Sequence, residues 1–185
     1  MPKVLLIAAL LGSLLLSAPR GDSDLGQEKT GGASAAEAAV KVTVTTGGGV
    51  HGPVKSQYRV GEDIPIMISL TNIADRPQKY CLSTSVFQDR PQLTKDGQLV
   101  PYVTDLVKVS ETEEYVQRCE TNAGKKFYEL QPKQTKAVDW ISLSRGVNWY
   151  GNLTPGHYEL ILSRRVVCCQ GPFVESNKIS FDIVP

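Results

Sequence analysis

The chain has 185 residues, and its 20 Lys and Arg residues nearly balance its 19 Asp and Glu residues, which leaves a formal net charge of +1. This balance gives no electrostatic reason to bind a polyanion, so nucleic acid is excluded as an expected partner. A membrane is expected as a partner only if an N-terminal leader stays attached to the chain.

Residues 1–18 have the order of a secretory signal peptide: the basic Lys3 precedes an apolar stretch that ends at Leu16. The stretch is shorter than the roughly 20 residues that a helix needs to cross a bilayer. Cleavage after Ala18 is disfavoured by Pro19, and the best small-x-small match, Ala33-Ser34-Ala35, lies far from the apolar stretch. We therefore expect an exported protein, extracellular or periplasmic, whose leader is either cleaved or kept as an N-terminal tether.

Residues 19–39 are small and polar and contain no aromatic residue. Such a segment cannot bury enough apolar surface to offset the entropy lost on ordering, so it is expected to be a flexible spacer. Residues 40–185 remain, and their length fits one domain of common size.

Apolar residues that recur at every second position predict the first strands of this domain. Val40 to Val44 form the first strand, which ends at Gly47-Gly48-Gly49. The strand Ile64 to Leu70 follows and leads into a turn at Asn72 to Pro77. Tyr80 to Phe87 reads as the next strand, with Leu82 and Val86 expected in the core and Cys81 facing away from it.

The second half of the domain shows a hairpin and three further strands. Asp96-Gly97 separates two short apolar runs and predicts a tight hairpin that hangs off the domain. In the strand Lys136 to Ile141, Val138 and Trp140 share one parity and are expected to face the core. The last two strands are expected at Tyr158 to Val167 and at Lys178 to Val184.

Seven to eight strands without any long helical pattern predict an all-β fold, an antiparallel immunoglobulin-like β-sandwich. Tyr158 follows the Pro155-Gly156 turn and opens a strand. That position suits a tyrosine corner, in which the tyrosine hydroxyl binds the upstream backbone.

An even number of cysteines in an exported chain favours disulfides, and the four are Cys81, Cys119, Cys168 and Cys169. A bridge within the vicinal pair would strain its small ring. If the strand at Cys81 neighbours the strand that ends near Cys168, Cys81 lies near that pair. We prefer Cys81 with Cys169 and Cys119 with Cys168, and the exchanged pairing stays open. Zinc is the alternative, but adjacent strand residues point to opposite sides and converge poorly on one ion.

Several motifs together resemble the BsuPI-type intracellular proteinase inhibitor domains over roughly residues 58–163. They are Val60-Gly61-Glu62, Ile64 to Leu70 with Thr71-Asn72, Lys95-Asp96-Gly97, Leu130-Gln131-Pro132 before Trp140, and Leu153-Thr154-Pro155-Gly156-His157-Tyr158. The resemblance implies one immunoglobulin-like sandwich. This chain departs from the family in its export leader, its four cysteines and its insertion around Cys119, and no reactive-site residue can be transferred.

Catalytic signatures are missing from the sequence: it has no Gly-x-Ser-x-Gly elbow and no acidic pair in a recognisable context, so an enzyme is not expected. His157 lies in a turn-to-strand motif and is expected to be an ordinary surface residue. Neither a cofactor nor a metal site is expected.

Trp149 and Tyr150, between Gly146 and Gly151, are expected in an exposed loop, where aromatic residues often anchor interfaces. The alternative is that they cap the open end of the sandwich. The sequence therefore predicts a secreted or envelope-tethered, non-enzymatic module that binds another protein, and the resemblance adds proteinase inhibition. A structural or assembly accessory domain of the cell envelope is the alternative function.

Overall fold

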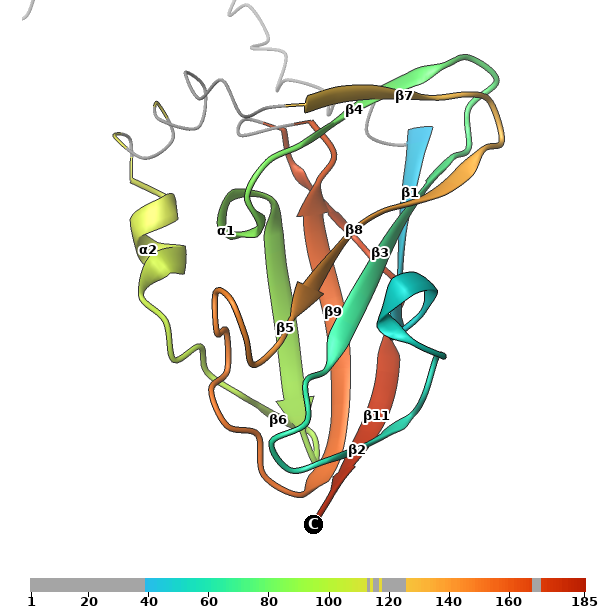
Figure 1. Ribbon diagram of the computed structural model, residues 1–185. Helices are drawn as coiled ribbons and strands as arrows, with labels where there is room; N and C mark the ends of the chain where they lie inside the picture. The colour runs from blue at the N-terminus through green and yellow to red at the C-terminus, as the bar shows by residue number, and fades with distance from the viewer. Residues whose placement is uncertain (1–38, 113, 115–116, 118–125, 168–170) are drawn as a thin grey trace, which may run out of the picture. The chain divides into compact units, whose positions relative to one another are not determined.

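The computed structural model describes residues 39–112, 114, 117, 126–167 and 171–185 (Figure 1). In them, two β-sheets pack face to face, and a third sheet has only two strands. In this part of the chain the strands are β1 (Val40–Thr46), β2 (Gln57–Arg59), β3 (Pro65–Asn72), β4 (Gln78–Leu82), β5 (Asp89–Lys95), β6 (Gln98–Leu99), β7 (Lys126–Leu130), β8 (Thr135–Ser142), β9 (Gly156–Arg165), β10 (Phe173–Glu175) and β11 (Ile179–Val184). Three short helices accompany them: η2 (Gly49–His51), α1 (Ser85–Gln88) and α2 (Leu106–Ser110). The predicted all-β sandwich is confirmed.

The smaller sheet has the order β1-β3-β8, and all its pairs are antiparallel. In β1 the valines at every second position are buried, as their alternation predicts. They lie beside buried residues of β3, with Val42 opposite Leu70 and Val44 opposite Ile68. This shared inward face forms one half of the core.

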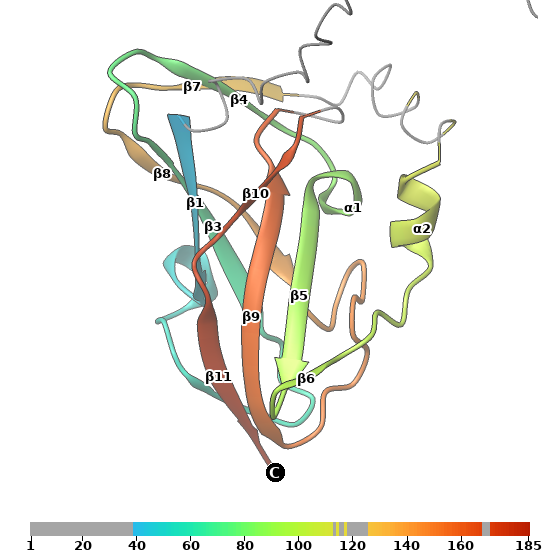
Figure 2. The same cartoon turned by 180° about the vertical axis from the view of Figure 1, so that it is seen from behind.

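The larger sheet has the order β2-β11-β9-β5-β6, with β10 paired to β9. Figure 2 shows its outer side, where β11, β9 and β5 run next to one another. Two details differ from the prediction. The β2–β11 pair is parallel, and the described residues form eleven strands instead of seven or eight. The additional strands include β2 and β10, which have three residues each and are too short to show an alternating pattern.

Two local predictions are confirmed at the ends of β9 and β5. The Tyr158 hydroxyl donates to the Thr154 carbonyl at 2.7 Å, which makes the tyrosine corner. Asp96 and Gly97 have φ of 50° and 81° and close the hairpin as a tight two-residue turn. The hairpin does not hang off the sandwich, however, because β5 pairs with β9 inside the larger sheet.

The strand predicted at 80–87 is shorter than expected. β4 ends at Leu82, α1 follows, and β4 pairs with β7 rather than with β9. The pairing with β7 sets the orientation of β4, so Cys81 is buried and Leu82 is only half-buried. This reverses the prediction that Leu82 faces the core and Cys81 faces away from it. The Cys81 N–H still donates to the Val166 carbonyl at 3.1 Å, so this segment does adjoin the end of β9.

A β-bulge in β8 corrects the prediction for Val138 and Trp140. Ile68 of β3 lies opposite Asp139, and Ser69 lies opposite Ala137, so Val138 is the extra residue. One extra residue reverses the inward parity for the rest of a strand. Trp140 therefore points outward, and Val138 is only partly buried.

The predicted leader and most of the predicted spacer, residues 1–38, lie outside the described residues and stay predictions. The first described strand, β1, begins at Val40. In the ranges that the structure describes, no helix has the length and apolar character needed to span a membrane.

Candidate functional site

The loop pair expected to anchor a partner is buried. Trp149 is 0% exposed and Tyr150 is almost as deeply buried. The Tyr102 ring packs against both, with centroid distances of 5.6 Å and 5.4 Å, and the Tyr150 hydroxyl donates to the Pro91 carbonyl. Burial raises the pKa of Tyr150 above its ordinary value. The expected exposure is wrong, because the β8–β9 connection folds back and these rings pack into the core.

Two large aromatic residues are exposed among those described: Phe127 of β7, at 67%, and Trp140, which is 44% exposed on the outer face of the smaller sheet. The His51 ring of η2 lies against it, with a centroid distance of 4.1 Å. Met67 of β3 is the cross-strand partner of Trp140, and neighbouring Val50 is 94% exposed. We call Val50, His51, Met67 and Trp140 the Trp140 platform.

A hollow of about 430 Å³ adjoins Trp140. Its lining includes Thr84 and Ser85 before and within α1, and Arg145 and Val147 in the β8–β9 connection. Trp140 thus contributes to a recess as well as to an exposed surface, and a partner side chain could enter beside it.

The rest of the outer face of the smaller sheet carries mostly short hydroxyl side chains. The hydroxyls of Thr71 and Thr135 share a hydrogen bond of 2.9 Å across β3 and β8. The Thr43 hydroxyl donates to the Ser69 carbonyl at 3.5 Å. Lys41 of β1, opposite Thr71, adds an exposed charge to this face. The exposed tryptophan matches the aromatic enrichment at the centre of protein interfaces.

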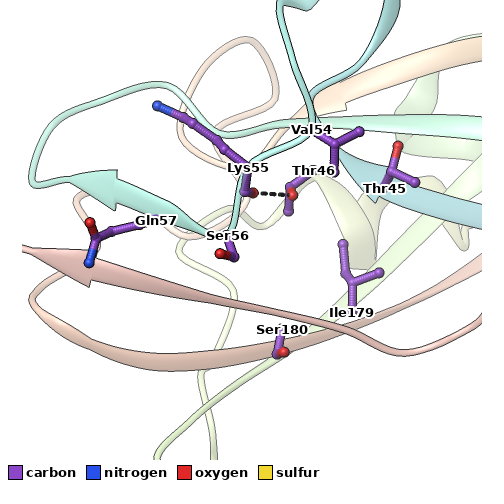
Figure 3. Close-up of a pocket in the computed structure, with 8 residues that line it drawn as sticks. All are labelled: Thr45, Thr46, Val54, Lys55, Ser56, Gln57, Ile179 and Ser180. Carbon is purple, nitrogen blue, oxygen red and sulfur yellow. Dashed lines mark hydrogen bonds between the residues drawn. The ribbon is translucent and has the colours of Figure 1, made fainter.

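A second recess lies at the edge where the two sheets meet (Figure 3). This edge groove has a volume of about 550 Å³ and is lined by Thr45, Thr46, Val54, Lys55, Ser56, Gln57, Ile179 and Ser180. The Thr46 hydroxyl donates to the Lys55 carbonyl at 2.5 Å across the groove. The Lys55 ammonium pairs with Glu62, and this hydrogen bond lowers the pKa of the Glu62 carboxyl.

A buried ionic cluster links the two sheets. Arg164 of β9 is 0% exposed, and its guanidinium binds Asp89 of β5 at 2.8 Å and Asp139 of β8 at 2.9 Å. Arg164 shares the inward parity of Tyr158, Leu160 and Leu162. The alternation of β9 therefore directs Arg164 inward. The sequence did not reveal its two carboxylate partners, because both come from other strands that are distant in sequence.

Asp89 is the most perturbed carboxyl group of the cluster. Complete burial, with a smaller contribution from the Asp139 charge, raises its pKa to about 7 against the lowering effect of Arg164. The Gln88 side chain closes one side of the cluster, donating to the Cys81 carbonyl at 2.9 Å and accepting from Arg164 at 3.2 Å. The ion pairs join the two sheets, while Asp89 Oδ2 and Arg164 Nε have no hydrogen-bond partner among the described residues.

The remaining predicted residues are scattered. His157 is exposed, as expected, and its Nδ1 lies 2.7 Å from Asp182 Oδ1. Cys81 takes part in a disulfide whose other cysteine lies outside the described residues, as do Cys119, Cys168 and Cys169, so the predicted pairing stays a prediction. Within the described ranges, no group of three or more His, Cys, Asp or Glu side chains is placed to hold a metal ion.

No family model matches the sequence, and no curated protein matches it. Among solved structures, a Listeria innocua β-glucosidase in complex with laminaribiose is similar at 10% identity and a TM-score of 0.35. The alkylpurine DNA glycosylase AlkC of Pseudomonas fluorescens is similar at 14% identity and a TM-score of 0.33. The matches cover 79% and 80% of this chain, but only 16% and 31% of those chains.

These neighbours contradict one prediction from the sequence, that the chain is not an enzyme. Both are enzymes, so the non-enzymatic prediction is not retained. This chain spans about a sixth and about a third of their lengths. At this low similarity, neither neighbour assigns an activity, a substrate or a partner to this chain.

Proposed function

We propose that this chain binds another protein through the Trp140 platform. The observation that carries the proposal is Trp140 itself: a large aromatic side chain 44% exposed on a β-sheet, although the same sheet buries its other face in the core. Tryptophan is among the residues that contribute most to protein interfaces when a partner covers it.

The platform is held in place before any partner arrives. His51 lies against one side of the Trp140 ring at 4.1 Å, and Gly49 enters η2 with a φ of 56°, which a glycine adopts without strain. An anchor that is already ordered loses less conformational entropy on binding. The hollow beside Trp140 adds a recess for a partner side chain.

We further propose that the protein is exported and meets its partner outside the reducing cytosol. The disulfide at Cys81 supports this proposal, because disulfides persist mainly in oxidising compartments. The leader pattern at residues 1–18 also supports export. It rests on the sequence alone, because those residues lie outside the described part of the chain.

Capture of partners by the immobilised protein tests the platform. We expect Trp140→Ala to weaken the capture of specific partners at least tenfold, and His51→Ala to weaken it less. Leu99→Ala is the control, because Leu99 is an even more exposed apolar residue, at 70% against 44% for Trp140, and lies on β6 in the other sheet. A proteinase among the captured proteins would point to inhibition, which an activity assay would then measure.

Stability must be measured alongside capture. Trp140→Ala should leave the free energy of unfolding nearly unchanged, whereas Trp149→Ala should lower it by about 3 to 5 kcal/mol because a buried aromatic ring is lost. Unchanged capture by a folded Trp140→Ala variant would disprove the proposal.

A further inference from the structure

A third recess lies where β2 ends and the β8–β9 connection passes. Its volume is about 160 Å³, and Arg59, Ser144, Arg145 and Asn152 belong to its lining. Arg59 is the last residue of β2, whereas the other three come from the β8–β9 connection. Because arginines from two separate segments line this hollow, we call it the arginine recess.

Both arginines of the recess are exposed and carry unpaired guanidinium groups. Within the described part of the chain, neither Arg59 nor Arg145 forms an ion pair or a side-chain hydrogen bond. Two like charges that line one hollow repel each other, and an anion bound between them would replace this repulsion by attraction. The arginine recess is therefore suited to an anion.

Glu62 is the acidic residue of the lining, and both of its carboxylate oxygens are already used. Oε1 pairs with the Lys55 ammonium, and Oε2 accepts from the Arg59 N–H at 2.9 Å. The charges of Lys55 and Glu62 cancel, so the two arginines give the recess its net positive charge. Asp63 is next in sequence, but it accepts a hydrogen bond from the Ser142 hydroxyl and is not part of the lining.

The size and the neutral residues of the recess favour a carboxylate over a larger anion. Its volume of about 160 Å³ corresponds to about five water molecules, enough for a carboxyl group on a short aliphatic stem. The Ser144 hydroxyl and the Asn152 amide can donate to the oxygens of the anion, as the guanidinium groups can. Buried Ile64 and Ile183 add apolar surface for the stem. A phosphate dianion would be repelled more strongly by Glu62.

Arg145 connects the arginine recess with the Trp140 platform. It lines the recess and also the hollow beside Trp140, so the two cavities lie on either side of one side chain. A partner that packs an apolar side chain beside Trp140 would therefore bring its neighbouring residues to the cationic recess. Charges that are complementary across an interface set its specificity and speed the encounter.

We propose that the arginine recess binds the carboxylate of an aspartate or glutamate side chain of the protein held by the Trp140 platform. This inference rests on the proposed function and adds the class of partner to it: a protein whose surface carries an acidic residue beside its apolar contact with Trp140. Arg59 and Arg145 supply the counter-charge, and Ser144 and Asn152 supply neutral donors.

A nuclear magnetic resonance titration tests the recess without any partner. The probe is N-acetylglutamate amide, which carries one side-chain carboxylate and no other charge. We expect it to shift the Nε–H signals of Arg59 and Arg145 saturably, whereas the uncharged N-acetylglutamine amide should leave them unchanged. Signals that do not saturate, or tighter binding of inorganic phosphate at the same ionic strength, would overturn the assignment of a carboxylate.

Capture by the immobilised protein tests whether the recess belongs to the same interface. Arg59 does not line the hollow beside Trp140, so Arg59→Gln changes the recess alone and should weaken capture roughly threefold. The double variant Arg59→Gln, Arg145→Gln should weaken capture roughly tenfold, and less at high salt, which screens charges. Arg76→Gln is the matched control, because Arg76 is an exposed and unpaired arginine in the β3–β4 turn.

The outcomes separate this inference from the proposed function. Loss of capture in Trp140→Ala with full capture in the double arginine variant would overturn the inference and leave the platform in place. Loss in the double variant with full capture in Trp140→Ala would overturn the shared interface and, with it, the proposed function. Urea unfolding should give the parent's stability for the arginine variants, because neither guanidinium forms a bond that the folded chain would lose.

Discussion

At the scale of single residues, the clearest feature is a fully buried arginine between two aspartates from different sheets. Burying charges costs several kcal/mol per ion, and mutual attraction offsets this cost only in part. Arg164 binds Asp89 and Asp139 with short ion pairs, so the cluster fixes how the sheets align rather than adding a large net stability. Removing Arg164 would leave the buried Asp89 carboxyl without this counter-ion, whereas removing one aspartate would leave Arg164 paired with the other.

The raised pKa of Asp89 predicts how stability changes with pH. Its pKa of about 7 in the folded state exceeds the ordinary value of 3.8, so the folded protein binds this proton more tightly. The stabilising contribution is complete below pH 3.8 and is lost as the pH rises through about 7. Urea unfolding between these values should show a fall on the order of a few kcal/mol in the free energy of unfolding.

Asp89→Asn is the matched variant for this prediction, because the amide has the same shape and does not titrate. We expect the variant to lose the fall assigned to Asp89 over this pH range. If its stability follows the pH as steeply as that of the parent, another group is responsible.

At the scale of elements, single interactions set the ends and the faces of strands. The bulge at Val138 turns Trp140 outward, and the tyrosine corner ties the start of β9 to the preceding loop. The bulge shows that one residue can determine which side chains of a strand reach the core and which reach the surface.

Tyr158→Phe tests the tyrosine corner. The change removes the hydroxyl that donates to the Thr154 carbonyl at 2.7 Å and keeps the buried ring, so we expect a loss of about 1 kcal/mol in the free energy of unfolding. Thr154→Ala is the control, since it removes only a side chain and leaves the accepting carbonyl in place. Equal losses for the two variants would argue against the corner.

At the scale of the whole molecule, disulfides are expected to join segments that the sheets leave apart. The Cys81 N–H donates to the carbonyl of Val166 at 3.1 Å, and Val166 lies two residues before the vicinal pair Cys168 and Cys169 in the sequence. This contact supports a bridge from Cys81 to one member of the pair, while the preferred pairing of Cys81 with Cys169 and of Cys119 with Cys168 stays a prediction.

Mass mapping of the exported protein should find two disulfides and no free thiol. Each bridge closes a loop of tens of residues, so reduction should lower the free energy of unfolding by about 3 to 4 kcal/mol per bridge. Cys119→Ser separates the two contributions, because it should leave the Cys81 bridge in place. A stoichiometric zinc ion, or four free thiols, would contradict this prediction.

The sequence by itself determined the β-sandwich class, the buried valines of β1, the Asp96-Gly97 turn and the tyrosine corner, because alternation and turn chemistry are local properties. The tertiary structure decided which tryptophan is buried. Trp149 lies outside any alternating strand and is enclosed by a loop that folds back, while Trp140 follows a bulge that only the register with β3 reveals. Pairing between distant strands sets these features, and the alternation within one strand does not indicate which other strand it will pair with or in which register.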